Sequence, residues 1–198
     1  MYPIIIDIDE IKHEFQDYTP EKAEQYQEKS AKEANKRFQK ALKQYKDKEI
    51  ILMSGGSASG KTEYRSKHLN DFQGIIFEST LRSTKGFEIK MEKIRKAKAK
   101  VSIHAIFPDS LKRAYIAFLN RERQFSDKYF YFTHSESRKT LLHIAKNYLE
   151  IEIKIFESMY AKNNLLFPEI KFHSKEELIE FLSNNQYNEK DIIKEIIQ

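Results

Sequence analysis

Residues 50–62 read IILMSGGSASGKT, and they carry the strongest structural signal in the chain. An apolar run of strand length comes first. A loop with three glycines follows, and then a lysine and a threonine at the start of a stretch, 62–72, that we predict to be helical. The pattern G-x-x-x-x-G-K-T between a strand and a helix is typical of loops that bind phosphate groups. The chain has only five glycines, so three within six residues indicate a close approach of backbone to a ligand.

Each residue type in this loop has a chemical purpose. Glycines let successive backbone N–H groups converge on phosphate oxygens, and the helix N-terminus adds the positive end of its dipole. The lysine, Lys61, would neutralise charge on the β- and γ-phosphates, and the hydroxyl of the threonine, Thr62, would be a ligand for Mg²⁺. We therefore predict that ATP or GTP binds with Mg²⁺ at Gly55, Gly56, Ser57, Ala58, Ser59, Gly60, Lys61 and Thr62. The loop alone does not choose between a kinase, a hydrolase and a nucleotide-dependent switch.

Apolar, strand-like runs alternate with helical stretches along the chain, which favours an α/β fold with a largely parallel sheet. We expect a long helix over 135–160, and strands at 4–9, 49–53, 74–78, 101–107 and 169–173. The predicted architecture is the three-layer fold of P-loop NTPases, with a five-stranded, mostly parallel sheet and a helical lid. It forms a single domain over 1–198, with the lid at about 121–140 and acidic C-terminal helices at about 174–198.

Acidic residues end several of the predicted strands. Asp7 and Asp9 follow the first apolar run, Glu78 ends the run after the loop, and Asp109 follows a later one. Ligands of open parallel sheets bind beyond the carboxyl ends of the strands, so these acids would face a bound triphosphate. Phosphoryl transfer to a hydroxyl needs such a carboxylate to accept the proton. The alternative interpretations are a helix cap for Asp9, an exposed strand end for Glu78 and only a helix cap for Asp109.

Arginines surround a basic, aromatic connector between two predicted helices. Arg121 and Arg123 end the first helix, Arg138 begins the second, and Arg82 follows Glu78. A connector of this kind is typical of a lid that closes over phosphates. The alternative is a packed aromatic corner with solvated arginines.

Composition excludes several classes of protein. There is no cysteine, which rules out disulfides, thiolate zinc sites and cysteine nucleophiles. No apolar run is long enough to span a bilayer, so we expect no membrane contact and a cytoplasmic location. The net charge is +5, but residues 150–198 hold ten acids and six lysines, so residues 1–149 carry +9. This basic portion suits a triphosphate and a small anionic acceptor; a nucleic-acid-binding module is not recognisable, which argues against nucleic acid as a partner.

Taken together, these stretches resemble the zeta-toxin family of P-loop kinases. That family combines a phosphate loop, an apolar strand ending in D-x-D with a catalytic Asp, a second strand ending in an E-G-T-like turn, and a lid with arginines. The corresponding stretches here are IIIDIDEIK (4–12), GGSASGKT (55–62) and IIFESTLRS (75–83). In the family the D-x-D strand follows the loop, whereas here it precedes it, which looks like a circular permutation. Ser79 also replaces the glycine of the turn.

The resemblance implies a kinase of a toxin–antitoxin system that transfers the γ-phosphoryl of ATP or GTP to a hydroxyl of UDP-N-acetylglucosamine, with an antitoxin protein as partner. It implies that Asp9 orients or deprotonates the acceptor, that Glu78 binds the acceptor or supports the metal, and that one or two of the arginines contact phosphate. The alternative acceptors are another nucleotide, a nicotinamide dinucleotide or a nucleic-acid 5′-hydroxyl. A nucleotide-binding switch or effector with little catalysis is the rival from another class.

Overall fold

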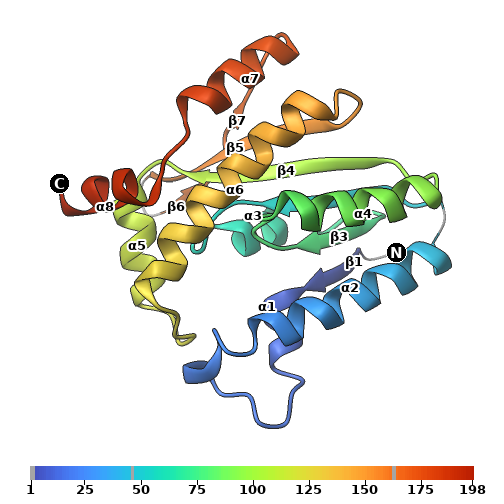
Figure 1. Cartoon of the computed structure of the whole chain (residues 1–198), viewed down its shortest axis with the longest axis horizontal. Coiled ribbons are helices and arrows are strands. Elements are labelled where there is room, and N and C mark those ends of the chain that lie inside the picture. Colours follow the sequence, from blue (N-terminus) through green and yellow to red (C-terminus); the bar gives the residue numbers. More distant parts are fainter. Residues whose placement is uncertain (1–2, 46, 162–163) are drawn as a thin grey trace.

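The computed structural model describes residues 3–45, 47–161 and 164–198, which form an α/β fold around one mixed, mostly parallel sheet (Figure 1). The strand order is β1-β3-β2-β4-β5-β6, and β7 also pairs with β5. The strands are β1 (Ile4–Asp7), β2 (Ile50–Ser54), β3 (Ile75–Glu78), β4 (Val101–Pro108), β5 (Glu152–Ala161), β6 (Asn164–Leu166) and β7 (Glu169–Ile170). The first five strands pair in parallel, whereas β6 and β7 run antiparallel to β5.

Helices cover both faces of this sheet. They are α1 (Ile8–Lys12), α2 (Gln27–Gln44), α3 (Lys61–His68), α4 (Thr84–Lys96), α5 (Leu111–Leu119), α6 (Asp127–Asn147), α7 (Lys175–Asn184) and α8 (Glu189–Ile197). The larger core cluster packs α2, α4, α6 and α7 against one face, and a smaller cluster packs α3 against the other. A third cluster joins α5, α6 and α8 at one end of the molecule.

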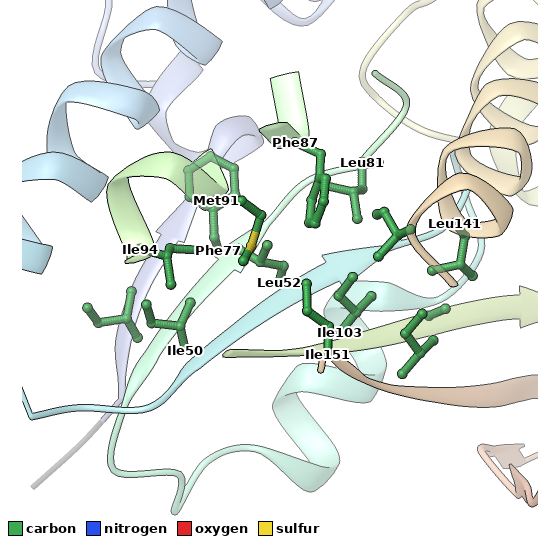
Figure 2. Close-up of a cluster of buried hydrophobic side chains, with 14 of the residues drawn as sticks. Ile50, Leu52, Phe77, Leu81, Phe87, Met91, Ile94, Ile103, Leu141 and Ile151 are labelled. Atoms are coloured by element: carbon green, nitrogen blue, oxygen red, sulfur yellow. The ribbon is translucent and has the colours of Figure 1, made fainter. Parts of the chain in front are cut away.

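Strand β2 shows how the sequence produces these two faces. All five of its residues are buried, and alternate side chains belong to opposite clusters. Ile50 and Leu52 lie in the larger cluster with Phe77 (Figure 2), while Ile51 and Met53 lie in the smaller one. A strand buried on both faces reads as a continuous apolar run, which is why this one was recognisable from sequence.

The predicted count of five strands and the predicted helix over 135–160 are both wrong for the described residues. Helix α6 begins earlier, at Asp127, and ends at Asn147, and the following residues form β5, the longest strand. Residues 152–155 alternate charged and isoleucine side chains, and Ile153 and Ile155 are buried. That alternation has the period of a strand, and parallel pairing with β4 decides the structure. The predicted fifth strand over 169–173 is reduced to the two residues of β7.

The N-terminal strand lies at one edge of the sheet. Strand β1 pairs in parallel with β3, and Asp7 lies opposite Glu78 in the register. The strand is separated in sequence from its partner by the whole of α2, β2 and α3 (Figure 1). Its carboxyl end therefore lies at the same edge of the sheet as the glycine-rich loop that follows β2.

None of the helices in the described ranges combines the length and the apolar character needed to cross a membrane.

Candidate functional site

The glycine-rich loop joins the end of β2 to the start of α3, as its sequence predicts. Gly60 is the N-cap of α3 with φ 90°, a left-handed conformation that glycine adopts without steric cost. Gly56 is closely covered, because a Cβ at this position would lie 2.3 Å from the imidazole of His134 in α6. The loop is therefore fixed on one side by the sheet and on the other by α6.

Helix α6 holds the loop through two polar contacts with Ser57. The backbone N–H of Ser57 donates to Thr133 Oγ1 at 3.0 Å, and His134 Nε2 donates to the Ser57 carbonyl at 2.8 Å. Burial lowers the pKa of His134 to about 3, so the imidazole is neutral near pH 7. These contacts set the shape of the loop before any ligand arrives.

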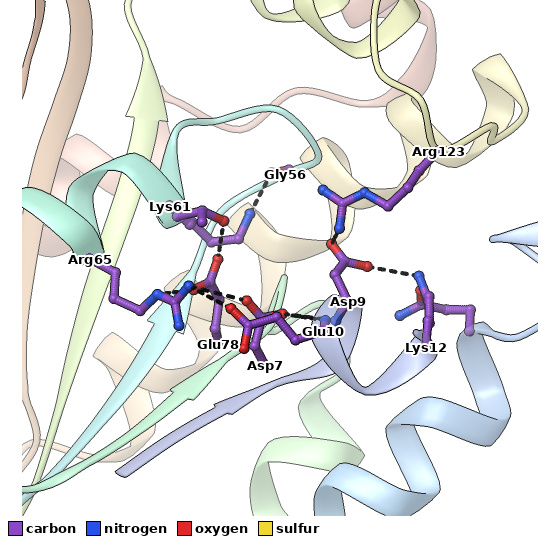
Figure 3. A network of polar contacts seen from close by, with 11 residues as sticks. Asp7, Asp9, Glu10, Lys12, Gly56, Lys61, Arg65, Glu78 and Arg123 are labelled. Atoms are coloured by element: carbon purple, nitrogen blue, oxygen red, sulfur yellow. Dashed lines mark hydrogen bonds and ion pairs between the residues drawn. The ribbon is translucent and has the colours of Figure 1, made fainter. Parts of the chain in front are cut away.

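Lys61 is the cation at the centre of the loop. Its Nζ donates to the carbonyls of Gly55 and Gly56, at 3.0 and 2.8 Å (Figure 3). Burial lowers the pKa of Lys61 to about 8, although the carboxylate of Glu78 opposes this shift. A bound triphosphate would add negative charge and raise the pKa again, so the ammonium form is favoured when a nucleotide is present.

Two carboxylates lie side by side below the loop, at the ends of neighbouring strands. Glu78 accepts from the Thr62 hydroxyl at 2.6 Å, and its Oε2 lies 2.9 Å from Arg65 Nε. Asp7 lies 3.5 Å from Arg65 Nη2 and caps α1 by accepting from the Asp9 N–H at 2.8 Å. Burial and the Asp7 carboxylate raise the pKa of Glu78 to about 7, and burial and the Asp9 carboxylate raise the pKa of Asp7.

Asp9 lies on the other side of this cluster, in the first turn of α1. Its Oδ1 accepts from Lys12 Nζ at 2.8 Å and its Oδ2 pairs with Arg123 Nη1 at 2.6 Å (Figure 3). Lys12 is fully buried and also donates to Gln27 Oε1 at 2.6 Å. Burial acts to raise the pKa of Asp9, but Lys12 and Arg123 outweigh it and the pKa is lowered, so Asp9 is ionised at neutral pH.

These groups line one cleft of about 280 Å³. Residues 57–62 of the glycine-rich loop form one wall, strand-end acids form the floor, and the segment between α5 and α6 forms the opposite wall. Arg121 from that segment lines the cleft and makes no ion pair with any residue the structure describes. The cleft thus has cations on two sides and an ionised carboxylate between them, which suits a polyanion and a hydroxyl that loses a proton.

The comparisons with known proteins address the fold. No protein-family model and no curated protein matches this chain. Solved structures share its fold. The native AvrRxo1-ORF1:AvrRxo1-ORF2 complex matches with a TM-score of 0.51 at 11% identity, covering 84% of this chain and 73% of that one. The same complex crystallised with ATP matches with a TM-score of 0.50 at 10% identity, covering 81% and 78%.

The residues around Thr62 fit a magnesium ion that is shared with a nucleotide. Mg²⁺ in phosphoryl-transfer sites is held by one or two carboxylates together with phosphate oxygens. The Thr62 hydroxyl and the Glu78 carboxylate supply hard oxygen ligands of that kind within hydrogen-bond distance of each other. In the described part of the chain, no three His, Asp or Glu side chains are grouped to hold a metal by themselves.

Among the predicted catalytic residues, the structure brings Asp9, Lys61, Glu78, Arg121 and Arg123 to the cleft, together with loop residues 57–62. It does not bring Arg138 there. Helix α6 begins at Asp127, so Arg138 lies in mid-helix, where its guanidinium packs over Phe107 and Tyr187 and donates to the Asn185 carbonyl at 2.8 Å. Arg121 and Arg123 follow α5, which ends at Leu119, rather than lying within it.

Sequence reasoning missed several functional neighbours. Lys12 and Arg65 hold the acids of the cleft, Gln27 accepts from Lys12, and Tyr129 lines the wall. The only local signal was the spacing of Asp9 and Lys12, three residues apart on a helix. Asp109, the fourth strand-end acid, pairs with Arg113, while Ser110 is the N-cap of α5.

Proposed function

We propose that this protein is a phosphotransferase that moves the γ-phosphoryl group of ATP or GTP to a hydroxyl. The observation that carries the proposal is the cleft itself: Lys61 of the phosphate loop and the ionised Asp9 line the same cavity, with Arg121 and Arg123 on its far wall. A hydrolase or a switch would need the loop, but would not need an ionised carboxylate placed for an acceptor hydroxyl.

In the proposed reaction the phosphate loop and Lys61 hold the triphosphate. Arg121 and Arg123 stabilise the charge that develops on the transferred group, and Thr62 and Glu78 would hold Mg²⁺. The magnesium ion, when bound, neutralises charge on the phosphate oxygens. Asp9 accepts the proton of the acceptor hydroxyl as the new O–P bond forms and the bond to the β-phosphate oxygen breaks.

Asp9 is fully engaged in the free protein, since Lys12 holds one oxygen and Arg123 the other. Lys12 comes from the same helix as Asp9, whereas Arg123 comes from the segment between α5 and α6. We infer that Arg123 turns from Asp9 to the phosphates when a nucleotide binds. That exchange frees Oδ2 for the acceptor hydroxyl.

The fold neighbours support nucleotide binding and a protein partner. The AvrRxo1-ORF1:AvrRxo1-ORF2 complex contains two different proteins and was crystallised with ATP. We extend both properties to this chain as proposals: ATP as the phosphoryl donor, and a second protein as a binding partner of the antitoxin kind that the zeta-toxin resemblance implies.

The acceptor is proposed from the same resemblance. UDP-N-acetylglucosamine is the first candidate, and other nucleotides, nicotinamide dinucleotides and 5′-hydroxyl oligonucleotides are the alternatives. The position of β1 beside β3 supports the proposed circular permutation, because it places the D-x-D residues at the loop although they precede it in sequence.

The test offers γ-labelled ATP and Mg²⁺ with each of these acceptors. We expect label transfer by the wild-type protein and a loss of about 100-fold or more for Lys61→Ala and for Asp9→Asn. Lys98→Ala, on the surface of the chain away from the cleft, is the matched control and should retain full transfer. Full transfer by Asp9→Asn would reject Asp9 as the base. ATP binding without transfer to any acceptor would favour the switch.

A further inference from the structure

A second cavity opens beside the cleft, on the side away from the phosphate loop. Its volume is about 720 Å³, and it shares Gln27 and Tyr129 with the cleft. Its walls come from α2, from the start of α6 and from the turn that follows β3, which contributes Arg82. A molecule bound beside Asp9 can therefore extend from the cleft into this cavity.

The last residue of β3 and the turn that follows it direct their side chains to different sites. Glu78 points to Thr62, Ser79 and Thr80 line the cleft, and Arg82 lines the second cavity. Between them, Leu81 is buried in the core with φ 49°, a left-handed conformation that is unfavourable for a leucine. Strain of this kind persists where the surrounding structure requires it, and it is concentrated at functional sites. Here the left-handed conformation of Leu81 turns the backbone, so that Leu81 is buried in the core while Arg82 lines the second cavity.

Arg82 is held against two aromatic rings, and one of its buried donors lacks a hydrogen-bonding partner among the described residues. Its guanidinium lies over the rings of Tyr129 and Phe132, at 4.9 and 5.2 Å from their centroids. Its Nη1 is buried and makes no hydrogen bond to any described residue. Buried donors are nearly always paired, so an unpaired one needs an explanation, and a guanidinium stacked on aromatic rings presents its donors in the geometry that phosphate and carboxylate oxygens accept.

The two acids of the second cavity are already engaged by other partners. Glu24 accepts from the backbone N–H and the hydroxyl of Ser126, at 2.7 and 3.2 Å, and Glu28 pairs with Lys32 at 2.7 Å. Lys128 adds a second cation to the wall. With both acids engaged, Arg82 and Lys128 are the charged side chains of the wall that are left to meet a ligand.

We propose that the second cavity is the subsite for a phosphate or diphosphate group of the acceptor, bound by the guanidinium of Arg82. This inference rests on the proposed function, and it narrows the acceptor to a phosphorylated molecule whose free hydroxyl reaches Asp9 while its existing phosphate lies at Arg82. An unphosphorylated sugar or nucleoside would leave Arg82 unpaired.

The direct test titrates inorganic pyrophosphate into the full chain by calorimetry, with and without a non-hydrolysable ATP analogue in the phosphate loop. We expect pyrophosphate to bind, and Arg82→Gln to weaken this binding by about tenfold or more. The matched control is Arg95→Gln, because Arg95 also stacks on a tyrosine, Tyr148, but lies far from both cavities. It should bind pyrophosphate like the wild type. Arg82→Lys keeps the positive charge but lacks the planar guanidinium, so it should lose less pyrophosphate affinity than Arg82→Gln. It also replaces Arg82→Gln in the test if thermal melting shows that Arg82→Gln folds poorly.

Equal pyrophosphate affinity in wild type and Arg82→Gln, or in wild type and Arg82→Lys, would overturn the proposal, as would the absence of binding in the wild type. The readout is independent of catalysis, so a chain that transfers no phosphoryl group can still confirm or reject the subsite. If transfer is detected, Arg82→Gln should raise the KM of the phosphorylated acceptor while the KM of ATP is unchanged.

Discussion

At the scale of single residues, the contact between Gly56 and His134 joins the glycine-rich loop to α6. A methyl group on residue 56 would lie 2.3 Å from the imidazole, which is buried and has no room to move. We expect Gly56→Ala to lower the free energy of unfolding by about 1–3 kcal/mol and to weaken ATP binding, because the loop or α6 must shift. Gly86→Ala is the control: its Cβ would meet only the Ser83 side chain, at 3.3 Å, inside a helix that favours alanine. Chemical denaturation measures both variants, and equal stabilities would contradict the role of the close contact.

His134 also makes stability depend on pH. Burial lowers its pKa from 6.5 to about 3, so the unfolded chain binds this proton below about pH 6.5 whereas the folded chain stays neutral until much lower pH. The free energy of unfolding should therefore fall as pH is lowered from about 6.5 towards 3, by about 1.4 kcal/mol per pH unit from this group. His134→Gln keeps a donor for the Ser57 carbonyl but does not titrate, and it should show a shallower decline. The same slope in both proteins would refute the assignment; His104, also buried, is present in both and cancels.

At the scale of elements, α6 is the helix that connects the site to the rest of the fold. Its first half holds the phosphate loop through Thr133 and His134, and its second half packs on the sheet through Leu141 and Ile144. Arg138 lies between these halves and contacts β4 and the loop between α7 and α8. Its role is to join elements rather than to bind phosphate.

The position of Arg138 leads to a prediction that separates it from the arginines of the cleft. Arg138→Ala should lower the free energy of unfolding by about 2 kcal/mol, because it removes a buried hydrogen bond and leaves a void between two rings. The KM of ATP should be unchanged. Arg123→Ala should do the reverse, with little effect on stability and a large loss of phosphoryl transfer. A loss of transfer in Arg138→Ala without a loss of stability would restore Arg138 as a lid residue.

Element prediction succeeded where the pattern was local and failed where pairing decided the structure. The run 50–53 predicted β2 because a strand buried on both faces is apolar throughout. The stretch that became β5 was predicted as the end of a helix, because its isoleucines and charges fit either period over a short window. Parallel pairing with β4, together with the antiparallel β6 and β7, made it a strand.

At the scale of the whole molecule, nucleotide binding should be visible as thermal stabilisation. A ligand that binds only the folded chain at about 100 times its Kd adds about 2.7 kcal/mol, which corresponds to a rise in Tm of about 5–10 °C for a chain of this length. We expect this rise with ATP and Mg²⁺ in a thermal shift assay, and a smaller one after EDTA removes the metal that Thr62 and Glu78 would hold. Lys61→Ala should show almost no rise; an undiminished shift in that variant would place the nucleotide elsewhere.

The sequence by itself determined the glycine-rich loop, its flanking strand and helix and the strand-end acids, because each is a pattern within a dozen contiguous residues. It determined the α/β class through the alternation of strand-like and helical stretches along the chain. Only the tertiary structure decided which of these residues meet. It placed Asp7 beside Glu78, surrounded Asp9 with Lys12 and Arg123, and directed Arg138 away from the cleft and Arg82 into a second cavity. The physical reason is that strand pairing and helix packing join segments tens of residues apart in the sequence. Burial and the charged neighbours that these segments supply then set the pKa of each ionisable side chain and determine which groups it can contact.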